Sequence, residues 1–204
     1  MYPGERFNGY SHLLGLMLAT AGSALLLART VPGGDPARTA SALVFALSMV
    51  TLYAASTLFH STRGRTRLFW QRVDHCAIYL LIAGSYTPFA LVTLQGAWGW
   101  ALLVATWGAA LFGIGRELRP GEPPRPSLLL YVGMGWIGVL AAAPIVERLD
   151  GAGLAWLLAG AALYSIGTVF YRNRRGWRHA HGTWHLFVLA GTVSHYVTVT
   201  RFVL

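Results

Sequence analysis

Apolar residues recur in seven long runs along this chain, and short polar or glycine- and proline-rich segments separate the runs. Each run is near the roughly 20 residues that an α-helix needs to cross the hydrocarbon core of a bilayer. The pattern therefore predicts an all-α integral membrane protein, a single domain over residues 1–204 built as a seven-transmembrane helix bundle. The expected spans cover roughly residues 10–29, 41–60, 74–94, 97–115, 127–145, 154–171 and 181–203.

Two of these spans contain residues that shape helices. Pro88 falls inside the third span and should kink it by freeing a carbonyl near Gly84. Gly133, Gly135 and Gly138 in the fifth span suggest that a neighbouring helix approaches closely there. We therefore expect a kinked third helix and a closely packed fifth one.

Composition agrees with a membrane location and argues against a nucleic-acid partner. The chain is 55% hydrophobic and 11% charged, whereas a soluble domain carries about twice that charged share. Its net charge is +9, but all 16 basic residues are arginines in short loops between apolar runs. That distribution favours membrane orientation over nucleic-acid binding. The single Cys76 excludes an intrachain disulfide, and no protein partner can be predicted.

The arginines also predict how the chain crosses the membrane. Twelve of them fall at the N-terminus and in alternate loops, namely Arg6, Arg63, Arg65, Arg67, Arg72, Arg116, Arg119, Arg125, Arg172, Arg174, Arg175 and Arg178. The other side has Arg29, Arg38, Arg148 and Arg201. The positive-inside rule then places the N-terminus in the cytoplasm and the C-terminus outside. We expect a multi-pass protein of the plasma membrane, which in a bacterium is the inner membrane.

Polar side chains gather at one end of three spans, where burial makes them candidates for function. Ser56 and His60 lie in the last turns of the second span, and Asp74 opens the third span at the same membrane face. His181 and His185 open the seventh span, again at that face. His60 and His185, which are 125 positions apart in sequence, are therefore expected at one depth.

Their spacing indicates a metal site. His181 and His185 are four residues apart and share one helical face, so both imidazoles can bind one ion. His60 would complete a three-histidine site with a fourth position left for water, which is typical of catalytic Zn²⁺. Asp74 could accept a proton from that water or orient it, and Ser56 could hydrogen-bond the water or a developing oxyanion. An isolated histidine here would more typically contact headgroups, but the convergence of these residues favours a metal.

Three other histidines receive different interpretations. His75 and His179 are expected at the interface, since His75 should point about 100° away from Asp74 on the helix. His195 lies deep in the seventh span and is either a buried hydrogen-bonding residue or an extra contact in a cavity. We expect the former.

A further polar group precedes the first span. Glu5, Asn8 and His12 are spaced so that they lie along one helical face on the cytoplasmic side. The favoured interpretation is a capping and interface cluster. The alternative is a structural role beside the metal, or direct chemistry.

These positions resemble the hemolysin III branch of the progestin and adiponectin receptor family. The stretches "DHCAIYLLIAGSYTPFAL" and "HGTWHLFVLAGTVSHY" are similar to that family throughout, and the likeness covers nearly the whole chain. The first-span pattern of the family is matched as well. The positions that carry the resemblance are Glu5, Asn8, His12, Ser56, His60, Asp74, His181 and His185.

The resemblance implies a seven-helix bundle that holds Zn²⁺ through His60, His181 and His185. It further implies a metal-bound water contacted by Asp74 and Ser56. The family belongs to a wider group of membrane hydrolases that includes alkaline ceramidases, so the implied chemistry is hydrolysis of a lipid amide.

Three functions remain open at this point. The first is a zinc-dependent intramembrane hydrolase, ceramidase-like, that acts on an amide or ester of a membrane lipid. The second is a non-catalytic membrane sensor or homeostasis protein in which the zinc is structural. A transporter or channel is disfavoured because the outer halves of the spans are almost wholly apolar and offer no polar path.

Overall fold

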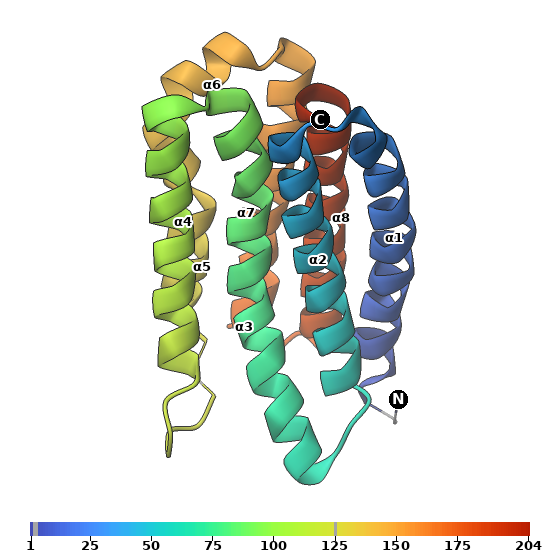
Figure 1. The fold of residues 1–204 in the computed structure, drawn as a ribbon. Coiled ribbons are helices and arrows are strands. Elements are labelled where there is room, and N and C mark those ends of the chain that lie inside the picture. Colours follow the sequence, from blue (N-terminus) through green and yellow to red (C-terminus); the bar gives the residue numbers. More distant parts are fainter. Residues whose placement is uncertain (2–3, 125) are drawn as a thin grey trace.

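Seven long helices stand side by side in one bundle (Figure 1). The computed structural model describes residues 1, 4–124 and 126–204. All seven helices are long and apolar enough to cross a membrane, which confirms the predicted all-α seven-span class. The two termini lie at opposite ends of the bundle (Figure 1). The cytoplasmic placement of the N-terminus stays a prediction from the arginine distribution.

Most helix boundaries lie close to the predicted ones. Asp35, Ser127 and Asp150 each precede a helix and accept hydrogen bonds from backbone N–H groups of its first turn. The elements are α1 (Arg6–Thr30), the 3₁₀ turn η1 (Val31–Gly33), α2 (Pro36–Phe59), α3 (Gly64–Pro88), the π-helix η2 (Phe89–Leu94), α4 (Gly96–Glu117), α5 (Leu128–Gly135), the 3₁₀ helix η3 (Ile137–Ala141), α6 (Ala142–Arg148), α7 (Gly151–Arg172), α8 (Ala180–Thr198) and the π-helix η4 (Val199–Val203).

The third span begins earlier than predicted. Its helix starts at Gly64 instead of residue 74, and with η2 it runs for 31 residues. That length is about 46 Å, against about 30 Å for the hydrocarbon core. The added residues are rich in arginine, so hydropathy gives no sign of them, and α3 extends beyond α2 at the N-terminal end of the bundle (Figure 1). Asp74 therefore lies about three turns inside the helix.

The fifth span is broken, where a continuous helix over 127–145 was predicted. The helix ends at Gly135 and resumes as α6 at Ala142. The Tyr86 hydroxyl of α3 donates to the Gly135 carbonyl (2.7 Å) and accepts from the Gly138 N–H (3.1 Å), so it satisfies backbone groups at the break. Gly133 and Gly135 have open space around them, and the predicted close packing is wrong at both. Gly138 does lie against the Tyr86 ring.

Pro88 closes α3, and the backbone widens directly afterwards into the π-helix η2. One turn before it, Gly84 packs directly against Ser48 of α2, where an added Cβ would have no room. The close contact between α2 and α3 holds in place the two helices that carry His60 and Asp74.

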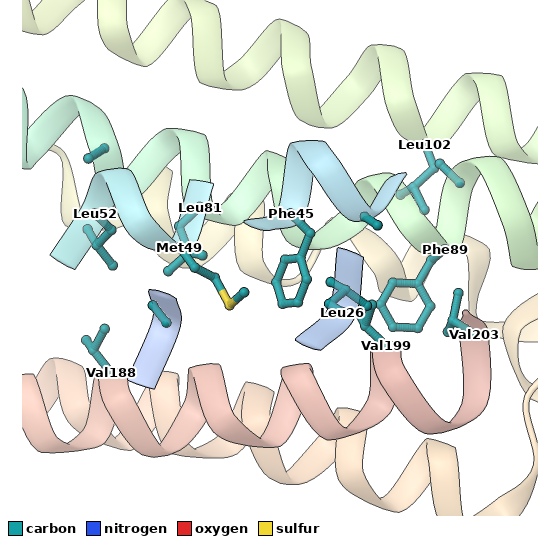
Figure 2. Packing of buried hydrophobic residues seen from close by; sticks show 14 of the residues in the cluster. Leu26, Phe45, Met49, Leu52, Leu81, Phe89, Leu102, Val188, Val199 and Val203 are labelled. Carbon is teal, nitrogen blue, oxygen red and sulfur yellow. The ribbon is translucent and has the colours of Figure 1, made fainter. Parts of the chain in front are cut away.

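The main hydrophobic core lies between α1, α2, α3 and α8 (Figure 2). Phe45 of α2 lies between Met49 of the same helix and Leu26 of α1, and Phe89 of η2 lies between Val199 and Val203 of η4 (Figure 2). These side chains are almost completely buried. Such packing fixes the relative positions of the four helices whose ends carry the polar residues described next.

Candidate metal centre

Three histidines meet at the end of the bundle where the N-terminus lies. His60 directly follows the last residue of α2, and His181 and His185 lie one turn apart at the start of α8. Their candidate ligand atoms all lie within 4.8 Å of one another. One metal ion can be held by this set. The three residues that the sequence predicts as ligands thus lie together in the structure.

The hydrogen bonds of this cluster leave nitrogens suited to a metal. His60 Nδ1 lies 2.8 Å from a carboxylate oxygen of Glu5, and His185 Nδ1 lies 3.0 Å from the Asn8 backbone carbonyl. Metal-bound histidines usually donate their other N–H to such acceptors. The Nε2 atoms of His60 and His181 are buried and have no hydrogen-bond partner among the described residues. A set of imidazole nitrogens fits zinc and several other divalent transition metals.

Glu5 connects α1 to this cluster, and the predicted capping role is wrong. Glu5 precedes α1 but makes no capping hydrogen bond with its side chain. Its carboxylate instead accepts from the Asn8 amide (2.8 Å), contacts His60 and forms an ion pair with Arg67 (3.0 Å). Partial burial raises the pKa of Glu5, but Asn8, His60 and Arg67 together outweigh it and hold that pKa below its ordinary value. The alternative interpretation, a structural role beside the ligands, fits this geometry.

Gly182 lets α1 approach α8 closely enough for these contacts. A Cβ at this position would collide with the ring of Phe7 and lie 3.0 Å from the side-chain oxygen of Asn8. The absence of a side chain therefore allows the Asn8 carbonyl to reach His185. The sequence shows the glycine but not the helix that it admits.

His12 adds a fourth imidazole to this end of the bundle. Its ring is buried and stacks on that of His185, with centroids 3.6 Å apart and an interplanar angle of 16°. Neither of its ring nitrogens has a hydrogen-bond partner among the described residues. An unpartnered buried imidazole is rare in folded proteins and marks a place where a bound group is expected.

A cavity of about 610 Å³ begins beside the histidines and extends along the bundle between α3, α5, α7 and α8. Along α7 its lining runs from Leu154 to Tyr171, a length of about 25 Å. Asp74 and Ser56, the residues predicted to act on water, are buried and line the same cavity as His181. The Ser56 side chain also lies close to the Asp74 carboxylate.

The lining of this cavity is most polar at the end where the histidine cluster lies, and a few polar side chains, among them Ser85, Ser165 and His195, line it further along. Besides the residues already named, Gln71 and Tyr171 contribute polar atoms near the histidines. Further along, leucine, isoleucine and valine side chains predominate. A molecule with one polar group and a long apolar chain matches this division.

The predicted interfacial role of His75 is wrong, whereas that of His179 fits the structure. His75 is buried, and its Nδ1 lies 2.7 Å from a carboxylate oxygen of Glu117 at the end of α4. Because α4 packs beside α3, a protein carboxylate takes the place that water or a headgroup would have at the interface. His179 is exposed at the start of α8.

His195 lies deep in α8, as expected. Its ring nitrogens are buried, and the ring packs edge-to-face on Tyr164 with centroids 5.4 Å apart. The ring fits beside Gly160, where a Cβ would clash with it, and it also lines the cavity. The second of the two sequence interpretations, a contact in the cavity, therefore describes its position.

The fold and the site define a heptahelical membrane protein with a largely buried three-histidine cluster that can hold a metal. The model of the haemolysin-III related family matches residues 2–196. This chain therefore belongs to that family, and the resemblance inferred from the sequence is confirmed.

Several known proteins are similar in sequence to this chain over nearly its full length. Hemolysin-3 of Bacillus cereus is 37% identical over 98% of this chain and 92% of its own length. The Hemolysin-3 homolog of Bacillus subtilis (strain 168) is 38% identical over 96% and 92%. The human Monocyte to macrophage differentiation factor is 26% identical over 96% and 82%. Together with the seven apolar helices, the bacterial relatives confirm a multi-pass integral membrane protein.

Proposed function

We propose that this chain is a zinc-dependent intramembrane hydrolase that cleaves the amide or ester bond of a membrane lipid. One observation carries the proposal. A three-histidine cluster, a buried carboxylate (Asp74) and a buried hydroxyl (Ser56) meet at the polar end of a long apolar cavity. Intramembrane carboxylates and histidines are costly to bury, and they usually mark function.

The residues divide the chemistry between them. His60, His181 and His185 would hold the zinc, which would supply a water of lowered pKa, near about 7, and a positive charge beside the carbonyl. Asp74 takes a proton from the water whose oxygen attacks the carbonyl carbon. Asp74 then returns this proton to the leaving nitrogen or oxygen as the bond to carbon breaks. Ser56 donates a hydrogen bond to the carbonyl oxygen while negative charge develops on it.

The cavity supports a lipid as the substrate. An acyl chain of one leaflet spans about half of the 30 Å hydrocarbon core, so it fits within the length of the cavity. The apolar lining suits the chain, and the polar end places the scissile group beside the histidines. We expect the tail to enter sideways between helices, near the broken fifth span.

The direct test uses purified protein with a panel of ceramides, simple acyl amides and acyl esters. Wild-type protein should release free fatty acid from at least one of them, and the His181→Ala variant should release none above background. Wild-type protein that carries a full equivalent of zinc and hydrolyses no lipid in the panel would contradict the proposal.

A second function is favoured by the way in which the cluster ties helices together. The Glu5–His60 and Asn8–His185 contacts connect α1 to α2 and to α8 at the metal ligands. A structural metal in a non-catalytic membrane sensor would use the same arrangement. In that case a cellular phenotype of the protein should survive Asp74→Asn and be lost with His60→Ala.

The Glu5→Gln variant should bind zinc about 10- to 100-fold more weakly than wild type. Glutamine keeps the shape of the side chain but lacks the charge that holds the His60 N–H and pairs with Arg67. Competition with a fluorescent zinc chelator measures the affinity. Glu122→Gln, at an exposed position of the α4–α5 loop, is the matched control and should leave it unchanged. Equal affinities in the two variants would remove Glu5 from the site.

A further inference from the structure

A second pair of ionisable side chains joins α3 to α4, and one of the two, His75, lines the same cavity. His75 Nδ1 lies 2.7 Å from Glu117 Oε1, and the two residues are only 8% and 5% exposed. The Tyr131 hydroxyl donates to the His75 backbone carbonyl (2.9 Å), and the Arg72 guanidinium donates to the Glu117 backbone carbonyl (3.1 Å). Both ends of the pair are therefore fixed in place. The proposed hydrolysis uses neither residue.

The other ring nitrogen of His75, Nε2, lies in a residue that lines the cavity and is left without a hydrogen-bond partner among the described residues. It is also not one of the fully buried nitrogen atoms of this part of the chain that lack a partner, so another molecule can reach it. His75 itself lines the cavity, directly after Asp74 in sequence. An imidazole nitrogen on a wall of a membrane cavity is unfavourable without a hydrogen-bond partner. A group of the bound molecule can be that partner.

The hydrogen-bonding capacity of Nε2 determines which kind of ligand group it can bind. If Nδ1 donates its hydrogen to the Glu117 carboxylate, Nε2 of a neutral ring is an acceptor. If the proton distribution is reversed or the ring is charged, Nε2 carries a hydrogen and donates. A hydroxyl group fits both cases because it donates and accepts, whereas an ether oxygen only accepts and a methylene does neither.

We propose that His75, oriented by Glu117, binds a hydroxyl group of the lipid next to the scissile bond. On this proposal, which rests on the proposed hydrolase function, His75 determines specificity and Glu117 is a positioning residue. The preferred substrates are lipid amides or esters that carry a free hydroxyl on the head side of the scissile bond. The His cluster and Asp74 act on the carbonyl, and His75 recognises the head group.

The test compares two ligands that differ only at this group, N-oleoylethanolamine and N-oleoylpropylamine, in which a methyl group that neither donates nor accepts replaces the hydroxyl. Binding is measured first on zinc-loaded Asp74→Asn protein, where turnover does not interfere. The hydroxyl compound should bind about 10-fold more tightly than the propyl compound, as expected for one buried hydrogen bond. The His75→Phe change in the same background should reduce that ratio to about 1 by weakening the hydroxyl compound alone. His179→Phe, at an exposed histidine outside the cavity, is the matched control and should keep the ratio.

Two further variants guard against misfolding. His75→Gln places an amide near the position of Nε2 and should keep most of the discrimination, while Glu117→Gln should reduce it in part by loosening the ring. Zinc content and melting temperature are recorded for each protein. In active protein, the loss in His75→Phe should appear in KM for the hydroxyl compound.

The outcomes separate this proposal from the hydrolase function. Two results would overturn the proposal: equal binding of the two ligands by the Asp74→Asn protein, or an unchanged ratio in folded His75→Phe protein. The His75–Glu117 pair would then serve only to connect α3 to α4. A 10-fold ratio that depends on His75, in a protein that hydrolyses no lipid, supports the hydroxyl site while it contradicts the hydrolase function.

Discussion

Replacing Asp74 by asparagine should lower lipid hydrolysis by about 10²- to 10⁴-fold and leave the metal bound. A positioned proton-transfer group contributes about this much to catalysis. Asparagine has nearly the same shape but cannot take a proton from water. Asp74 is not part of the candidate ligand set, which consists of His60, His181 and His185, so the ion should stay bound in the variant. The measurement is kcat/KM for the best lipid of the panel, together with zinc content by elemental analysis.

Asp150→Asn is the matched control for this change. Asp150 accepts a hydrogen bond from the backbone N–H of Gly153 at the opposite end of the bundle, a role that asparagine also fills. This variant should keep wild-type activity. The contrary result is an Asp74→Asn protein that is folded, carries zinc and hydrolyses lipid at the wild-type rate. Asp74 would then not be the base, and the structural-metal function would gain support.

Removing the metal should lower the thermal stability of the protein strongly. Two of the three clustered histidines lie in α8 and the third directly follows α2, and Glu5 and Asn8 at the start of the chain contact two of the three. An ion at about a thousand times its dissociation constant stabilises the folded state by about 4 kcal/mol. Treatment with a strong chelator should therefore reduce the melting temperature in detergent, and added zinc should restore it.

The control for chelation is His181→Ala, which lacks one ligand. Its melting temperature should start lower and respond little to the chelator. Melting curves of wild-type protein that are identical with and without a strong chelator would show that no metal stabilises this end of the bundle.

The number and order of the helices could be predicted from the sequence because apolar length alone determines which segments cross a bilayer. Two departures have physical reasons. The first turns of α3 are arginine-rich and lie beyond the apolar run, so hydropathy does not report them. The break in the fifth span depends on the Tyr86 hydroxyl, which reaches it from another helix.

The candidate site could likewise be predicted only in part from the sequence. His60, His181 and His185 could be brought together from sequence because helix direction fixes membrane depth and four-residue spacing fixes a shared face. The residues of other helices that these side chains contact could not be predicted from the sequence. Glu5 reaches His60 only because α1 packs against α2, and His75 meets Glu117 only because α4 packs beside α3. Such pairings depend on helix rotation and neighbour order, which hydropathy does not contain.

The most direct test of the central claim, a metal held by three histidines from α2 and α8, is elemental analysis of purified protein. The wild type and the His179→Ala control should each carry about one equivalent of zinc, and His181→Ala should carry almost none. Equal and negligible metal in all three proteins, each folded and purified without chelators, would contradict the claim.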